Sequence, residues 1–212
     1  MKAFIFDMDG VIIDSEPLHN KIVRSILAEN NIIVTNEEFN KFTGMASTAV
    51  FDIFIKQNNL PYTPEQLSKR QMDKLKNYIV EYHVKPIEGI IPLIQKLHDK
   101  NIPLAIASSS PLDMIEFTTK KFGINEYFTT LISGEDLPHS KPAPDIYLKT
   151  AKMLNIAPSD CVALEDSKNG SIAAKSAGMY CIGFANPNSG NQDLSAANII
   201  VNKITDIDID KL

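Results

Sequence analysis

The chain has 212 residues, of which 44% are hydrophobic, 8% aromatic and 22% charged. This composition is typical of a folded globular protein and too apolar for a disordered one, and the length suits one large domain or two modest ones. The net charge is -5 and no block of like charge stands out, which argues against a nucleic-acid partner bound through its phosphates.

The cysteines and the first residues bear on the cellular compartment. Cys161 and Cys181 form no C-x-x-C pair and are too few for a disulfide framework, so a reducing environment is expected. No apolar stretch of signal-peptide length precedes Asp7, and no run approaches the ~20 apolar residues of a membrane span. The sequence therefore predicts a cytoplasmic, soluble protein without a membrane partner.

The first predicted element is a strand at 3–6, a short apolar run that ends at Asp7. No strand-like run appears in 15–85. Apolar residues at helical spacing predict helices around 18–27 and 50–55, and the capping box Thr63-Pro64-Glu65-Gln66 predicts a helix reaching about residue 82. We expect 15–85 to be a helical cap domain inserted into an α/β core of residues 1–14 and 86–212.

After residue 86, strands and helices are predicted to alternate. Short, nearly continuous apolar runs, typical of strands buried on both faces, lie at 103–107, 130–132, 161–164, 180–184 and 198–201. Helical patterns lie at 90–100, 111–122, 144–154 and 169–177. Ser110 is the expected N-cap of the second helix and Gly123 its C-terminal stop. The alternation predicts a doubly wound parallel sheet with a Rossmann-like core.

Polar side chains follow four of these strands. Ligands of open α/β sheets bind beyond the carboxyl ends of the strands, so these groups are expected to converge if the strands are neighbours. In chain order they are Asp7 and Asp9, then Ser108, Ser109 and Ser110, then Lys141, and finally Glu165 and Asp166.

The residue types in this set favour phosphoryl chemistry. Four crowded acids repel one another unless a hard cation joins them, and carboxylate ligands suit Mg²⁺. Ser108 and Lys141 supply a hydroxyl donor and a cation, which a phosphoryl group needs during transfer. Asp7, at the end of its strand, is the predicted nucleophile, and Asp9 is the predicted general acid and base.

These motifs resemble those of the haloacid dehalogenase superfamily. Asp7-Met8-Asp9-Gly10-Val11-Ile12 is similar to its first motif. Ser108, Ser140-Lys141-Pro142 and Glu165-Asp166-Ser167 are similar to the second, third and fourth, in the same order. The insert resembles the helical cap of the family, so the resemblance covers nearly the whole chain. It is strongest for the β-phosphoglucomutase-like phosphatases.

The resemblance implies a role for each strand-end residue. Asp7 would be nucleophile and Mg²⁺ ligand, and Asp9 would be general acid/base and offer its backbone carbonyl to the metal. Asp166 and Glu165 would complete the metal site. Glu165 would either bind the metal directly or contact only the residues that bind it. The phosphoryl group would be bound by Ser108, Lys141 and the backbone N–H groups of Met8, Asp9 and Ser109.

The resemblance is weaker in the predicted cap. His19 matches a hinge histidine of the subgroup, with an ordinary polar contact as the alternative, and Gly44 matches a glycine of the mutases. Mutase members carry an arginine after that glycine and a lysine on a later cap helix, where this chain has Ser47 and Gln71. The losses favour a phosphatase, although nearby cations can substitute as substrate contacts: Lys41, Lys69, Arg70 and Lys74.

The sequence thus predicts a Mg²⁺-dependent phosphatase that hydrolyses a small phosphorylated metabolite, with a sugar phosphate expected, through an aspartyl phosphate. A monomer is expected and an oligomer is left open. One alternative is a hexose-phosphate mutase, which returns the phosphoryl group to its substrate. Another is a non-catalytic phosphoacceptor or signalling domain, against which the large insert argues.

Overall fold

The computed structural model describes residues 1–40, 42, 45 and 47–212, and it divides into two compact units. The larger unit comprises Met1–Glu16 and Lys85–Leu212, and the smaller comprises Pro17–Val84. Ser15, Glu16 and Lys85, which the sequence assigned to the insert, therefore fall within the larger unit. In the described part of the chain, no helix is both long enough and apolar enough to cross a membrane.

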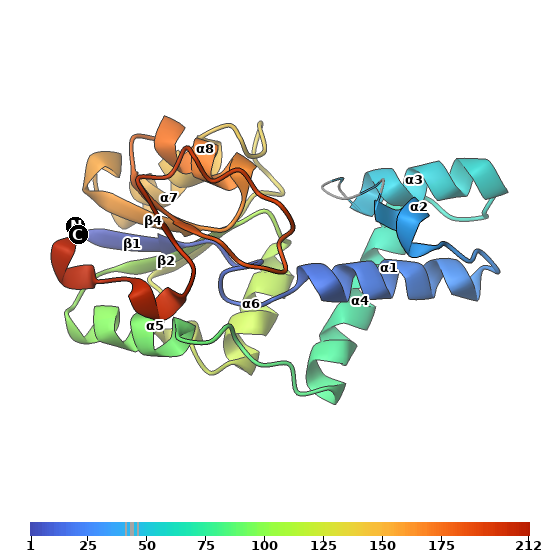
Figure 1. The fold of residues 1–212 in the computed structure, drawn as a ribbon, viewed down its shortest axis with the longest axis horizontal. Coiled ribbons are helices and arrows are strands. Elements are labelled where there is room, and N and C mark those ends of the chain that lie inside the picture. The colour runs from blue at the N-terminus through green and yellow to red at the C-terminus, as the bar shows by residue number, and fades with distance from the viewer. Residues whose placement is uncertain (41, 43–44, 46) are drawn as a thin grey trace. The chain divides into compact units, whose positions relative to one another are not determined.

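The larger unit is built on a six-stranded sheet in which all neighbours are parallel, in the order β3-β2-β1-β4-β5-β6 (Figure 1). This order confirms the predicted doubly wound, Rossmann-like arrangement. The middle strands β1, β2 and β4 are buried along their whole length, which explains why their sequences are continuous apolar runs and do not alternate with polar residues. The strands are β1 (Ala3–Phe6), β2 (Leu104–Ser108), β3 (Thr130–Ser133), β4 (Cys161–Glu165), β5 (Tyr180–Phe184) and β6 (Ile199–Val201).

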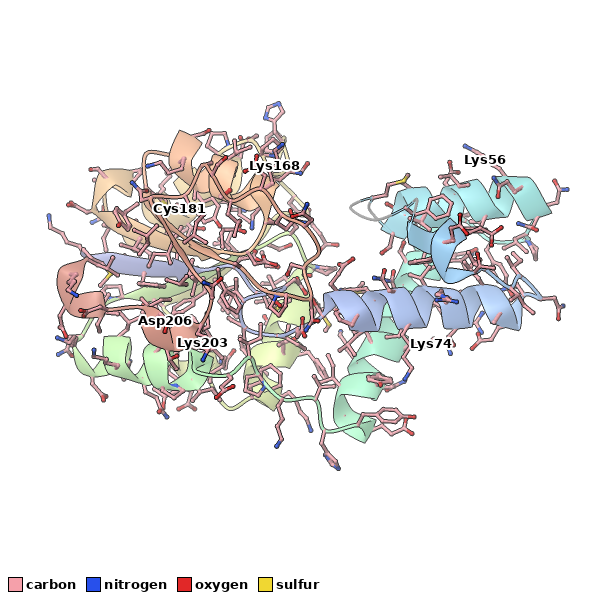
Figure 2. The ribbon with its side chains drawn as sticks, in the orientation of Figure 1. Lys56, Lys74, Lys168, Cys181, Lys203 and Asp206 are labelled. Atoms are coloured by element: carbon pink, nitrogen blue, oxygen red, sulfur yellow. The ribbon has the colours of Figure 1, made fainter. Side chains whose placement is uncertain are left out.

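Helices cover both faces of this sheet, with α5 and α6 on one face and α7 and α8 on the other (Figure 1). The apolar layer beneath α7 and α8 includes Ile5, Ala163 and Cys181, the last of which is labelled in Figure 2. The helices are α5 (Ile90–Asp99), α6 (Leu112–Lys121), α7 (Asp145–Leu154) and α8 (Lys168–Ser176). Short 3₁₀ turns lie at Asn125–Tyr127, Pro158–Asp160, Ile204–Asp206 and Ile209–Lys211.

The predicted N-cap of α6 is wrong. The helix begins at Leu112 with Pro111 in the cap position, and no side chain caps it. Ser110 precedes a proline, which favours an extended backbone, and its hydroxyl instead donates to the Asp9 carboxylate at 2.6 Å. A charged acceptor brought near by the fold thus replaces the local capping bond.

The smaller unit is helical, as the insert was predicted to be. Its helices are α1 (Glu16–Glu29), α2 (Asn36–Asn40), α3 (Ser47–Asn58) and α4 (Pro64–Glu81). The capping box at α4 is present in full, with Thr63 and Gln66 each bonding the backbone N–H of the other. Leu27, Phe51 and Leu75 are fully buried and form part of its core. Gly44 and Lys41 lie outside the described residues.

Candidate active site

The strand order brings the predicted site residues to one edge of the sheet. β1 lies between β2 and β4, and Phe6 is in register with Ile106 on one side and Leu164 on the other. The chain leaves β1 and β4 through acidic residues directly after these positions. Asp7, Glu165 and Asp166 are all buried, and each offers an oxygen within 4.8 Å of the other two.

Lys141 lies inside this acidic cluster. Its Nζ is 2.7 Å from Asp7 Oδ1 and 2.6 Å from Glu165 Oε1, and it also donates to the carbonyl of Ala107 at 3.2 Å. Burial opposes the charge of the ammonium, but the Asp7 and Glu165 carboxylates outweigh it and raise the pKa of Lys141. The lysine is therefore a charged hydrogen-bond donor at the carboxyl end of β1.

One lysine does not balance the three acids. Burial raises the pKa of Asp7 well above its usual value, and repulsion from Glu165 and Asp166 adds to this despite the attraction of Lys141. Burial, followed by repulsion from Glu165, raises the pKa of Asp166 to about 7. The excess of buried negative charge is the condition that a bound cation relieves.

Glu165 is held more tightly than its acidic neighbours. Besides Lys141, its Oε1 accepts from the buried hydroxyl of Tyr147 at 2.6 Å, and its Oε2 accepts from the Ser167 hydroxyl at 3.1 Å. A Cβ on Gly170 would lie 2.0 Å from this carboxylate, so the first turn of α8 closes the remaining space. Glu165 therefore holds Lys141 in place and also presents a carboxylate oxygen close to those of Asp7 and Asp166.

Asp9 directs its carboxylate to hydroxyl groups. Oδ1 accepts from Ser15 at 2.6 Å, and Oδ2 accepts from Ser110 at 2.6 Å and from Ser108 at 3.3 Å. Three hydroxyl donors hold the side chain in one orientation. Ser15 and Ser110 were not predicted in this role. Ser15 lies six residues after Asp9, whereas Ser110, 101 residues away, is brought to it by the proximity of β1 and β2.

The predicted phosphate-binding residues line the same edge. The Ser108 side chain is fully buried, and its Oγ also accepts from the N–H of Ser110 at 3.0 Å. Ser109 is exposed. The Met8 side chain is buried, and its carbonyl accepts from the N–H groups of Ile12 and Ile13.

In the smaller unit, the predicted substrate residues have partners within that unit. His19 Nδ1 lies 3.0 Å from Nε2 of Gln71, whose side chain is fully buried. Arg70 and Lys74, the second of which is labelled in Figure 2, both pair with Glu29, at 2.5 and 2.7 Å. These contacts join α1 to α4, and a substrate role for His19 or Arg70 stays a prediction.

Comparison with known proteins places the chain in a family. Residues 4–184 match the family model of the haloacid dehalogenase-like hydrolases. Hexitol phosphatase B of Escherichia coli K12 is 33% identical over 193 residues, which cover 89% of this chain and 86% of that protein. A phosphorylated carbohydrates phosphatase of Thermotoga maritima is 31% identical over 179 residues, covering 84% and 82%.

A solved structure agrees. The β-phosphoglucomutase of Clostridium difficile superposes with a TM-score of 0.79 at 25% identity, covering 100% of this chain and 95% of that one. With the buried acids and Lys141 at the carboxyl edge of the sheet, these matches show that the chain belongs to the haloacid dehalogenase-like hydrolase family, as an enzyme of the phosphoric monoester hydrolase class.

Proposed function

We propose that this enzyme hydrolyses a small sugar phosphate in a Mg²⁺-dependent reaction that passes through an aspartyl phosphate on Asp7. The observation that carries the proposal is the buried cluster of Asp7, Glu165 and Asp166, with Lys141 2.7 Å from Asp7. The names of the relatives, which refer to hexitol phosphate and phosphorylated carbohydrates, support a sugar phosphate as substrate.

The donor set fits Mg²⁺. It consists of carboxylates, the hard oxygen ligands that Mg²⁺ prefers. Burial, with added repulsion from Glu165, raises the pKa of both Asp7 and Asp166. Asp7 and Asp166 would bind the ion, with the backbone carbonyl of Asp9 and an oxygen of Glu165 as the other proposed ligands. When bound, Mg²⁺ would neutralise this charge and that of the phosphoryl oxygens.

The first half of the reaction uses Asp7 as nucleophile. Its carboxylate oxygen attacks phosphorus, and the bond between phosphorus and the sugar oxygen breaks. Lys141 attracts the Asp7 carboxylate and, with Ser108, binds the phosphoryl oxygens where negative charge gathers. Asp9 in its protonated form gives its proton to the departing sugar oxygen.

The second half returns the enzyme to its starting state. Asp9, now ionised, accepts a proton from a water molecule, whose oxygen attacks the phosphorus of the aspartyl phosphate. The bond between phosphorus and Asp7 breaks, releasing inorganic phosphate. The hydroxyls of Ser15 and Ser110 hold the Asp9 carboxylate in place.

The test is a phosphate-release assay on hexose 1-phosphates, hexose 6-phosphates and hexitol phosphates, with Mg²⁺ or with EDTA. We expect sustained release from at least one sugar phosphate with Mg²⁺, none with EDTA, and recovery when Mg²⁺ is restored. Activity that survives exhaustive EDTA treatment would contradict the metal assignment. Failure to turn over a generic aryl phosphate as well would favour the non-catalytic phosphoacceptor.

The mutase alternative predicts a different product. A hexose 1-phosphate with a trace of hexose bisphosphate would give isomerised sugar phosphate without stoichiometric inorganic phosphate. We expect the opposite, because the position assigned to a mutase lysine holds the neutral, buried Gln71 bonded to His19. The cap role of the smaller unit, a cytoplasmic location and a monomeric state stay predictions.

A further inference from the structure

The segment 186–192, which follows β5, reaches the acidic cluster through one side chain. We call it the 186–192 loop. The hydroxyl of Ser189 donates a hydrogen bond to Oδ2 of Asp166. The two residues are far apart along the chain, and nothing in the four strand-end motifs includes Ser189.

The same oxygen of Asp166 is enclosed from another side by Gly10. A Cβ at that glycine would lie 1.9 Å from Oδ2 and 2.8 Å from Ser189 Oγ, and its φ of +77° also favours glycine. The carboxylate is therefore confined between the first-motif backbone and the serine hydroxyl. Its orientation relative to Asp7 depends on both.

The 186–192 loop is itself anchored at both ends. The buried Asn186 amide donates to the carbonyl of Gly10 at 2.9 Å and to Asp14 at 3.4 Å. Gln192 accepts from the N–H of Lys168 at 3.0 Å and donates to the carbonyl of Ser189 at 2.9 Å. Lys168 begins α8 (Figure 2), so the loop is tied to both strand-end segments that carry the acids.

We propose that Ser189 is a positioning residue that sets the affinity of the enzyme for Mg²⁺. This inference rests on the proposed magnesium site. The hydroxyl binds Oδ2 of Asp166 and thereby leaves Oδ1 as the oxygen directed to the ion. Hydrogen bonds that orient a metal ligand are typically worth 10–100-fold in metal affinity or activity.

The test is calorimetric titration of the full-length, metal-free protein with MgCl₂, without substrate. Three variants are compared with wild type: Ser189→Ala, Ser189→Thr, and the matched control Ser195→Ala, which removes an exposed hydroxyl from the same region. We expect the Kd for Mg²⁺ to rise roughly 10–100-fold in Ser189→Ala. Ser189→Thr, which keeps the hydroxyl, should recover most of the affinity, and Ser195→Ala should match wild type.

Two further measurements separate positioning from folding. Thermal unfolding in EDTA should give the same midpoint for Ser189→Ala and wild type, and phosphate release by Ser189→Ala should approach the wild-type kcat at saturating Mg²⁺. A Kd unchanged in Ser189→Ala would overturn this inference alone. The inference would also be overturned if Ser189→Thr bound Mg²⁺ as weakly as Ser189→Ala and had a lowered thermal unfolding midpoint in EDTA. No Mg²⁺ binding by wild type would overturn the proposed function and this inference together.

Discussion

Two charge clusters in this molecule have opposite compositions. In the larger unit, Lys141 lies between the carboxylates of Asp7 and Glu165, and the three side chains are 9%, 9% and 0% exposed. In the smaller unit, Glu29 lies between Arg70 and Lys74, and these side chains are 36%, 41% and 34% exposed. The separations of the charged atoms are similar, so burial is the main difference.

Burial reverses the effect of the ion pairs on the acids. Hydrogen bonding and attraction by Lys74, with a contribution from Arg70, lower the pKa of Glu29 although partial burial opposes them. In the larger unit burial outweighs Lys141, and the pKa of Asp7 is raised. An exposed cluster joins two helices at little cost, whereas a buried one accumulates negative charge that suits a bound cation.

The largest expected effect is on turnover by Asp7→Asn. The amide is not a nucleophile, so we expect phosphate release to fall at least ~10⁴-fold, as when other covalent catalysts lose their nucleophile. The amide oxygen can still accept from Lys141, so circular dichroism should show an intact fold. Retained Mg²⁺-dependent turnover would mean that another group attacks phosphorus.

Lys141→Met is expected to have the largest effect on stability. It leaves Asp7 and Glu165 buried without their cation, which should lower the free energy of unfolding by about 3–5 kcal/mol, measured by urea denaturation in EDTA. The matched control is Lys74→Met, which removes one cation from the exposed cluster and should cost less than about 1 kcal/mol. Equal losses of unfolding free energy in Lys141→Met and Lys74→Met would refute the claim that burial distinguishes the two clusters.

The pH dependence of the metal-free protein should include a contribution from Asp166, and Asp7, whose pKa is also raised, acts in the same direction. The pKa of Asp166 is about 7 when folded against an ordinary value of 3.8, so the native state holds this proton more tightly than the unfolded chain. The free energy of unfolding in EDTA should therefore fall as pH rises from about 4 to 7, by up to ~1.4 kcal/mol per unit of pKa difference.

Urea midpoints at pH 5 and pH 8 measure this effect. Asp166→Asn should reduce the pH-dependent loss, and saturating Mg²⁺ should offset it by binding only the native state. A loss of the same size in Asp166→Asn and wild type would assign the pH dependence to other groups.

Glu29→Gln is expected to have the smallest effect. It removes the acid at the centre of the exposed cluster, and surface ion pairs are worth ~0–1 kcal/mol. Urea denaturation in low and high salt should show a loss below about 1 kcal/mol that shrinks as salt increases. A loss as large as that of Lys141→Met would show that α1 and α4 depend on this cluster for their packing.

Elements governed by local chemistry could be predicted from the sequence. The strand at 3–6 is found at those residues because an apolar run between polar segments leaves few alternatives. The capping box at Thr63 forms because both partners lie within one turn. The short helix α2 gave no periodic pattern, because a five-residue helix has too few turns to show one.

Contacts between segments far apart in the sequence were harder to predict. Ser110 was predicted to cap α6 and instead binds Asp9, which lies 101 residues away in the chain. Tyr147 and Ser189 carried no local signal, because the carboxylates that their hydroxyls bind, Glu165 and Asp166, become neighbours only in the folded chain.

The sequence by itself determined the alternation of strands and helices and the residue types at the strand ends, because apolar periodicity and motif spacing are properties of short segments. The tertiary structure decided that Lys141 meets Asp7 across 134 residues, and that hydroxyls from elsewhere hold Asp9, Glu165 and Asp166 in place. These distances, and the burial that shifts the pKa values, depend on strand order and side-chain packing, which no local pattern encodes.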